Sequence, residues 1–235
     1  MKDWKVFWQN YRLITITTKS DLLFQVGKTV GGEVITETQL EHDVNEIIEH
    51  LSLTNEDVVL DLCCGNGVLS NALSFHVKHI VGVDFSAPFI KNAKEFNNRD
   101  NIVYCEADIL DKDLISKVIE EYRVTKVLMY DCLAYFNPVL INELLEGLKD
   151  YRLNILMSSV LDRTKKWVFY NTFKRKLAYV MDLYILGKSS GIGYWWDKQE
   201  LIDIGNKNNY QAQYFYHHEA NHTQHYRFNI KLSNT

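Results

Sequence analysis

The sequence predicts one α/β domain: a doubly wound, seven-stranded, mostly parallel sheet that ends in an antiparallel β-hairpin. Three observations support this fold class. The 235 residues are enough for one large core, and 46% hydrophobic with 24% charged residues is typical of globular proteins. Short apolar runs alternate with helical patterns, as in parallel sheets with right-handed crossovers. Two aromatic, strand-like runs follow each other near the end of the chain.

The first regular helix is expected to begin after Thr36, which has the spacing of a capping box with Gln39. Apolar residues then follow the 3.6-residue period through Leu51. Val58–Leu62 is a continuous apolar run, as in a strand buried on both faces. Further strands are expected at His79–Val83, Ile102–Tyr104, Lys126–Tyr130 and Leu153–Val160, and helices at Val68–Phe75, Pro88–Phe96, Leu114–Tyr122 and Pro138–Leu148.

The end of the chain departs from this alternation. Asp197 and Glu200 have the spacing of an N-cap and N3 pair, which predicts a helix through about Lys207. Tyr210–His218 and His225–Leu232 are expected to be two strands joined by a short turn. A closing antiparallel hairpin on a parallel sheet is unusual for a dehydrogenase.

Composition argues against several classes of protein. The formal net charge of −4 argues against a dedicated nucleic-acid coat, so no DNA partner is expected. The four cysteines lack zinc or disulfide spacing, which favours a reducing cytoplasm. Residues 1–8 lack an apolar signal region, and no apolar run reaches the roughly 18 residues of a membrane span. We expect a cytoplasmic protein without a membrane partner, and the oligomeric state is not predicted.

Three acidic residues stand at the ends of successive expected strands. Asp61 opens a turn of small residues that runs through Gly67 into a helix and allows backbone amides to approach a ligand. Asp84 ends the next strand, 23 positions later, near the offset of about 20 residues for a ribose-binding carboxylate. Asp108 follows the third strand. Because ligands of open α/β sheets bind beyond the carboxyl ends of the strands, this order indicates a nucleoside-containing cofactor.

With these residues the sequence resembles the class I S-adenosylmethionine (SAM) dependent methyltransferases, over roughly residues 58–162 and more weakly through the terminal hairpin. The resemblance implies a Rossmann-like fold, SAM as cofactor and a small-molecule acceptor. One departure is that the family usually has glycine where Cys63 stands; cysteine is small, and we expect the turn to survive. The cofactor-binding residues implied are Asp61, Cys63, Gly65 and Gly67 around the methionine part, Asp84 at the ribose, Phe85, Asp108 and Ile109 around the adenine, and Asp131 near the sulfonium.

The segment Phe24–Thr29 imitates a phosphate-binding loop. That motif needs a glycine five positions before Gly27, where Leu22 stands, and a preceding strand, so we reject it. Two interpretations stay open for this segment. It either folds over the cofactor edge, with Lys28 as a cofactor contact, or forms an ordinary surface turn.

His218–His222 formally matches the HExxH zinc motif, but that chemistry needs a helix and this segment lies between two expected strands. A chance match is the favoured interpretation, and no metal is expected. The connection opens on the cofactor edge in this fold, so His217 and His218 are candidate general bases and His222 is a candidate substrate contact. The alternative is that these histidines are solvated turn residues.

Asp131 and Tyr135 follow the fourth strand and are the other catalytic candidates. Their segment, Asp131–Phe136, lacks the two prolines typical of enzymes that methylate DNA bases or protein glutamine. Tyr135 either contacts substrate or packs under the following helix.

Residues 163–188 hold seven basic residues and one acid, interleaved with aromatic residues, and are too long for a simple connection. We expect one or two helices in an insertion (about 163–195) over the substrate pocket, beside an N-terminal helical cap (about 1–50), in one domain over residues 1–235. Arg163, Lys166 and Trp167 are the candidate substrate contacts for an anionic small molecule. The alternative is an amphipathic helix pair with solvated charges, and RNA ranks third.

The function favoured by the sequence is methyl transfer from SAM to a small, anionic acceptor, with oxygen favoured over nitrogen. A loose resemblance to enzymes of surface-polysaccharide or nucleotide-sugar pathways suggests the substrate class. Two other classes stay open. An NAD-dependent oxidoreductase would share the glycine-rich turn and Asp84, and a non-catalytic SAM-binding subunit would share all of the cofactor residues.

Overall fold

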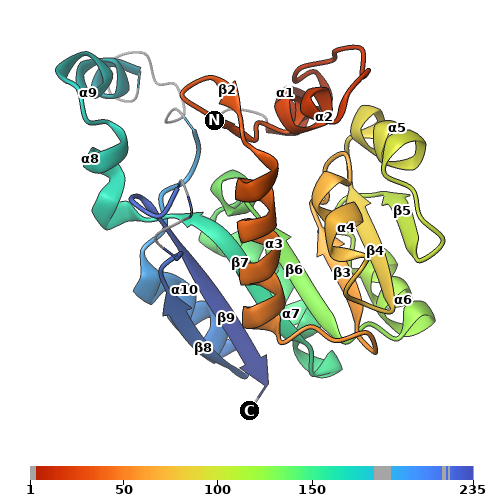
Figure 1. The fold of residues 1–235 in the computed structure, drawn as a ribbon. Coiled ribbons are helices and arrows are strands. Elements are labelled where there is room, and N and C mark those ends of the chain that lie inside the picture. The colour runs from red at the N-terminus through yellow and green to blue at the C-terminus, as the bar shows by residue number, and fades with distance from the viewer. Residues whose placement is uncertain (1–3, 183–191, 219–220, 222, 235) are drawn as a thin grey trace.

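The computed structural model describes residues 4–182, 192–218, 221 and 223–234, which form a central sheet with helices on both faces (Figure 1). The strands of the sheet are β3 (Val58–Leu62), β4 (His79–Asp84), β5 (Ile102–Glu106), β6 (Lys126–Tyr130), β7 (Asn154–Leu161), β8 (Tyr210–Phe215) and β9 (Arg227–Asn234). Their order is β5-β4-β3-β6-β7-β9-β8. Strands β3 to β7 pair in parallel, and β9 is antiparallel to β7 and β8. The expected α/β fold with its terminal antiparallel pair is confirmed.

Helices cover both faces of the sheet and enclose two apolar layers. One face packs against α3 (Glu37–Leu51), α4 (Val68–Leu73) and α5 (Ala87–Phe96), and the other against α6 (Lys112–Tyr122), α7 (Pro138–Leu148) and α10 (Lys198–Lys207). Every residue of β3 is buried because helices cover this central strand on both sides. Within the described residues, no helix is long and apolar enough to cross a bilayer.

Smaller elements lie around the carboxyl ends of the parallel strands. They are α1 (Trp4–Gln9), α2 (Lys19–Gln25), the antiparallel pair β1 (Thr29–Val30) and β2 (Glu33–Val34), the 3₁₀ turn η1 (Leu133–Tyr135), α8 (Lys166–Phe169) and α9 (Phe173–Val180). Two further 3₁₀ turns, η2 (Lys149–Tyr151) and η3 (Arg163–Lys165), flank β7. Asn66, in the turn after β3, holds the N-terminal segment in place: its Nδ2 donates to Leu22 O at 2.8 Å and to Gln25 Oε1 at 2.9 Å.

Local sequence signals agree with the structure where they predict helix starts. Thr36 and Gln39 form the expected capping box, and Asn137 caps α7 by accepting from the Leu140 amide at 3.0 Å. The Asp197 side chain caps α10, which ends at Lys207 as predicted. These caps depend on contacts within one turn of the chain, so the sequence alone identifies them.

The prediction of a short turn in the terminal hairpin was wrong. Strand β8 ends at Phe215 and β9 begins at Arg227, so residues 216–226 separate them. Described residues of this connection make polar contacts with α3. His217 Nδ1 lies 2.6 Å from Glu46 Oε2, and Asn221 Nδ2 donates to Asp43 Oδ1 at 2.8 Å.

Gly67 is a position where the fold requires glycine. Its φ is +76°, and a Cβ would lie 2.3 Å from the hydroxyl oxygen of the buried Tyr104. We predict that Gly67→Ala lowers the free energy of unfolding by about 3 kcal/mol, the combined cost of left-handed strain and overpacking. Gly147→Ala in α7 is the control, because its Cβ would make only an ordinary contact, 3.7 Å from Lys112 of α6, and the change should stabilise by up to about 1 kcal/mol. Urea unfolding measures both, and equal effects would contradict the prediction.

Candidate active site

A cavity of about 470 Å³ opens beyond the carboxyl ends of the parallel strands. It lies where the strand order reverses, between β3 and β6, as expected for ligand sites in open α/β sheets. Its walls come from the turns after β3, β4, β5 and β6, from the N-terminal segment, and from β9. Segments far apart in the sequence therefore share one cavity.

The turn between β3 and α4 follows a left-handed path. Cys63, Gly65 and Gly67 have φ values of 65°, 58° and 76°. The expected turn thus forms with cysteine in a conformation that glycine adopts more easily. Asp61 is 2% exposed beneath the turn and accepts a hydrogen bond from Ser70 Oγ at 2.5 Å. Burial raises the pKa of Asp61 to about 7, against the lowering effect of the Ser70 hydrogen bond.

Asp84 connects the end of β4 to the same turn. Its Oδ2 accepts from the Gly65 amide and its Oδ1 from the Ser86 amide, both at 2.9 Å. Burial raises the pKa of Asp84 to about 6, although both backbone hydrogen bonds lower it. Each carboxylate oxygen keeps further acceptor capacity, because a carboxylate has about four lone-pair sites. Asp84 can therefore hold a pair of hydroxyl groups in the cavity.

The turn after β5 forms the neighbouring wall. Asp108 and Ile109 both line the cavity, together with Phe85 from the turn after β4. Asp108 accepts from the Leu110 amide at 3.1 Å and forms an ion pair with Lys5 of α1. Phe89 of α5 adds a second aromatic side chain. This part of the cavity suits a flat, partly polar ring.

Asp131 and Arg227 form an ion pair in the cavity wall. Asp131 follows β6 with a φ of 54°, and Arg227 is the first residue of β9. The same guanidinium nitrogen of Arg227 donates to Ser159 O at 2.6 Å, while its Nε has no hydrogen-bond partner among the described residues. Arg227 is not among the site residues predicted from the sequence. The signal that could have indicated Arg227 is a basic residue at the start of the last strand, which pairs antiparallel with β7.

An aromatic wall, made of Trp4, Trp8, Tyr11 and Tyr135, also lines the cavity. The ring centroid of Tyr135 lies 4.8 Å from that of Trp4 and 5.2 Å from that of Trp8, and Trp8 lies 4.7 Å from Tyr11. Tyr135 thus lines the cavity and also packs against Trp4 and Trp8. The contribution of α1 was not predicted, although Trp4, Trp8 and Tyr11 have the four- and three-residue spacing of one helix face.

Lys28 lines the cavity from the N-terminal segment, together with Gly27 and Thr29. Its ammonium group is 3.4 Å from Asp43 Oδ2 and lies 3.6 Å from the ring centroid of Tyr130. Lys28 is 8% exposed. Of the two interpretations of this segment, the structure thus favours a fold against the cavity.

The two described histidine candidates, His217 and His218, are not among the cavity's lining residues. His217 is 5% exposed and lies against Glu46 and Asn229. Its Nδ1 is 3.2 Å from Nδ2 of Asn229. The backbone amide of His218 donates to Glu46 Oε1 at 3.2 Å. His222 lies outside the described residues, as do two other members of the HExxH segment, Glu219 and Ala220. Among the described residues, no group of three or more metal-ligating side chains occurs.

The three substrate candidates of the basic segment also lie away from the cavity lining. Arg163 pairs with Asp197 at 2.6 Å, and Lys166 Nζ donates to Tyr179 Oη at 3.1 Å. Trp167 is 48% exposed. Phe169 of α8 and Ile192 are the described residues of the insertion that line the cavity.

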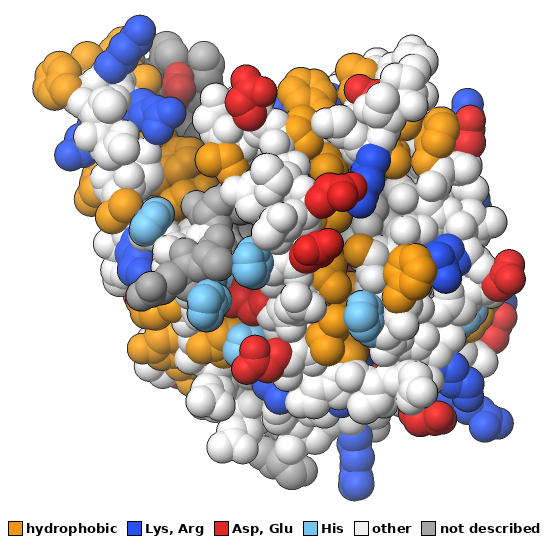
Figure 2. Space-filling view, in the orientation of Figure 1, with side chains coloured by type: hydrophobic (Ala, Val, Ile, Leu, Met, Phe, Trp, Pro, Cys, Tyr) orange, Lys and Arg blue, Asp and Glu red, His pale blue; other side chains and the backbone are white. Residues whose placement is uncertain are grey.

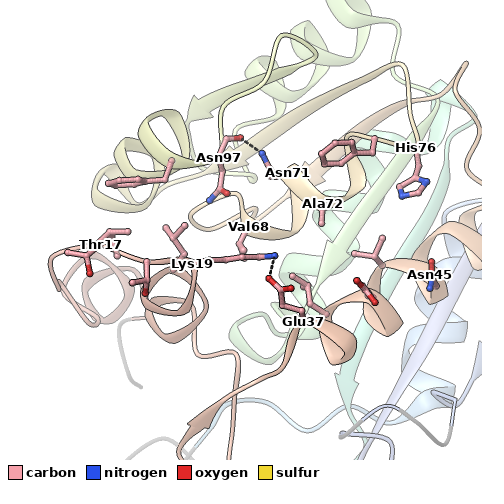
Figure 3. Close-up of a pocket in the computed structure, with 17 residues that line it drawn as sticks. Thr17, Lys19, Glu37, Asn45, Val68, Asn71, Ala72, His76 and Asn97 are labelled. Atoms are coloured by element: carbon pink, nitrogen blue, oxygen red, sulfur yellow. Dashed lines mark hydrogen bonds and ion pairs between the residues drawn. The ribbon is translucent and has the colours of Figure 1, made fainter.

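A second cavity of about 720 Å³ lies between α2, α3 and α4 (Figure 3). Lys19 and Glu37 form an ion pair at 3.0 Å across it, and Asn71 Nδ2 donates to Asn97 O at 3.2 Å. None of the strand-end acids lines this second cavity. It therefore lacks the polar groups expected for a nucleoside site.

Comparison with known proteins agrees with this geometry. Residues 59–151 match the family model described as "Methyltransferase domain". An uncharacterised RNA methyltransferase of Chlorobaculum tepidum is 29% identical over 96 residues, which are 40% of this chain and 20% of that protein. A 23S rRNA (uracil(1939)-C(5))-methyltransferase of Francisella tularensis subsp. novicida is 28% identical over 111 residues, 44% of this chain and 25% of that protein. The chain thus spans a fifth to a quarter of the length of these curated relatives.

Solved structures share the fold over nearly the whole chain. A SAM-dependent methyltransferase from Anabaena variabilis has a TM-score of 0.62 at 16% identity and covers 99% of this chain and 93% of its own. The magnesium protoporphyrin IX methyltransferase of Synechocystis PCC 6803, solved with bound S-adenosylhomocysteine (SAH), has a TM-score of 0.59 at 14% identity. The match covers 97% of this chain and 92% of that chain. Residues 59–151 thus match a methyltransferase domain, and the strand order with acids at the strand ends agrees with the fold of these SAM-dependent methyltransferases.

Proposed function

We propose that this chain transfers the methyl group of SAM to a small acceptor that binds against the aromatic wall. The observation that carries the proposal is one cavity with two chemically different halves. The acidic turns after β3, β4 and β5 form one half, and the aromatic wall with Asp131 and Arg227 forms the other. A nucleoside cofactor fits the first half, and an acceptor with an apolar or planar body fits the second.

The residues of the first half fit SAM. Asp84 would accept from the ribose hydroxyls, and Asp108 and Ile109 would contact the adenine beside Phe85. Asp61, Cys63 and Gly65 would surround the methionine part together with Lys28, and Gly67, which is not in the cavity lining, would shape their turn. When bound, SAM supplies a methyl group already activated by a positively charged sulfonium.

The second half would accelerate methyl transfer mainly by positioning the acceptor against the methyl group, because that methyl group needs no further activation. The ion pair with Arg227 fixes the Asp131 carboxylate at the junction of the two halves. Oδ2 of Asp131 would take the proton from an acceptor hydroxyl, in keeping with oxygen as the favoured acceptor atom. Burial raises the pKa of Tyr135, so its hydroxyl stays protonated and can donate to the acceptor. These roles replace the general base expected from His217 or His218.

An anionic acceptor receives less support than an apolar one. The cations among the described lining residues are Lys5, Lys28 and Arg227, and each is paired with a carboxylate. Arg163 and Lys166 could attract an anion only outside the cavity. We therefore favour a small acceptor with an apolar or aromatic body. RNA, the substrate named for some curated relatives, ranks lower because this chain matches only a fraction of those proteins.

Loss of the Asp84 carboxylate should weaken cofactor binding. Replacing Asp84 by Asn removes acceptor capacity for charge-assisted hydrogen bonds of about 1.5–3 kcal/mol. We expect the Kd for S-adenosylhomocysteine, measured by calorimetry, to rise about 10- to 100-fold. Asp100→Asn, at an exposed loop position, is the matched control and should leave the Kd unchanged. A Kd for Asp84→Asn within twofold of the wild-type value would refute the assigned role.

Cofactor affinity should fall as the pH is lowered through about 6. The raised pKa means that Asp84 is protonated below about pH 6 and ionised above it. The protonated form accepts hydrogen bonds less well, and ligand binding should therefore release protons between pH 5 and about pH 6.5. Calorimetry in buffers of different ionisation enthalpy measures this release. In Asp84→Asn the release should diminish; an undiminished release would assign it to another group.

Methyl transfer itself can be tested with an acceptor panel. We expect labelled SAM to methylate small phenolic or other aromatic hydroxyl acceptors. Trp8→Ala should raise KM for the acceptor about 10-fold through lost aromatic contact while the Kd for S-adenosylhomocysteine changes little. Val139→Ala, at an exposed position on α7, is the control. SAM binding without turnover on any acceptor would favour a non-catalytic SAM-binding subunit.

A further inference from the structure

A surface of unusual composition lies outside the cavity, on the lobe formed by α8 and α9. Figure 2 shows hydrophobic and basic side chains together over these helices, at the upper left. Large apolar side chains here are exposed to solvent: Trp167 48%, Val168 51%, Phe173 82%, Leu177 48%, Val180 39% and Met181 42%. Isolated exposed apolar residues are ordinary, but a contiguous group indicates an interaction site.

The apolar residues of α9 lie on one stripe. Phe173, Leu177 and Val180 are spaced by four and three residues, and Met181 follows at the next position of the same face. Tyr179 is on the opposite side, where it is 7% exposed and packs on Tyr170 with ring centroids 4.6 Å apart. Helix α9 therefore packs against the protein through Tyr179, and its apolar stripe is exposed to solvent.

Positive charge flanks this stripe. Lys174 and Lys176 are exposed and, at 100° per residue, project to either side of the apolar stripe. Residues 163–182 contain six basic residues and one acid, in a chain whose formal net charge is −4. The positive charge is thus a local property of this lobe.

We propose that α8 and α9 dock this protein on the surface of an anionic lipid bilayer, with α9 lying in the plane of the interface. An outward apolar stripe between lysines is the pattern of interfacial helices, and anionic headgroups complement the lysines. A helix that lies in the interface does not cross the bilayer. The proposal is therefore compatible with a sequence in which no apolar run is long enough for a membrane span. It differs from the expectation that the protein has no membrane partner.

Two other partners fit the surface less well. RNA would pair with the lysines but would leave Leu177, Val180 and Met181 without apolar contacts. A second copy of the chain in a symmetric dimer would cover the stripe but would bring the two basic lobes together. A bilayer surface satisfies both the apolar and the cationic parts.

The lobe also contributes to the cavity, because Phe169 of α8 lines it. Docking would therefore bring one wall of the cavity close to the lipid surface. The inference does not depend on methyl transfer, since vesicle binding can be measured without SAM or acceptor.

Co-sedimentation of the full chain with vesicles tests the proposal. We expect binding to phosphatidylglycerol-rich vesicles, weaker binding to pure phosphatidylcholine, and loss of most binding in high salt. Phe173→Ser with Leu177→Ser should reduce partitioning more than about 10-fold through lost apolar burial. Lys174→Gln with Lys176→Gln should reduce it about 30-fold, given roughly 1 kcal/mol for each lysine near an anionic surface.

Matched controls come from exposed positions of other helices. Val139→Ser on α7, and Lys91→Gln with Lys94→Gln on α5, should leave partitioning unchanged. An unchanged Kd for S-adenosylhomocysteine shows that the lobe variants are folded. The proposal is overturned by absence of vesicle binding, by equal binding to both lipid compositions, or by equal losses in lobe and control variants. Salt-sensitive RNA binding, or self-association lost in the Phe173→Ser and Leu177→Ser variant, without vesicle binding, would assign the surface to those partners instead.

Discussion

The site depends on one constraint: the left-handed turn after β3 must close onto the carboxylate that ends β4. The Gly65 amide donates to Asp84 at 2.9 Å, and the Cys63 amide donates to Val83 O at 2.8 Å. These bonds join the ends of two neighbouring parallel strands and bury Asp61 and Asp84 beside each other. Burial raises the pKa of both acids. A positively charged group bound in the cavity would therefore favour the ionised form of both acids.

The same turn also fixes the wall on the opposite side of the cavity. Asn66 donates to Leu22 and Gln25 of the N-terminal segment, while its own carbonyl accepts from Asn97 Nδ2 at 2.8 Å. Buried hydrogen bonds of this kind are costly to break, because each lost partner leaves an unsatisfied polar group. One buried asparagine therefore couples the turn beneath the cofactor site to the segment that leads to the aromatic wall.

Sequence patterns predicted the parallel part of the sheet because its signals are local. Buried apolar runs such as Val58–Leu62 and caps such as Thr36 depend on neighbours in the chain. The acids at the strand ends were found for the same reason: parallel strands bring their carboxyl ends to one edge. Arg227 and the tryptophans of α1 reach the cavity only through tertiary packing. His217 was one candidate base from the sequence, but no local pattern reveals its contact with Glu46 of α3.

Charge pairing in the cavity also explains the distribution of cations over the molecule. Lys5, Lys28 and Arg227 line the cavity, yet each is balanced by a carboxylate, while Asp61 and Asp84 have no such partner among the described residues. The interior therefore favours a positively charged ligand, as a sulfonium is, and opposes an anion. The exposed basic residues of α9 lie outside the cavity, on a lobe whose one described residue in the cavity lining is Phe169. Their charge acts on what approaches the protein from outside, whereas we propose that the aromatic wall selects the acceptor.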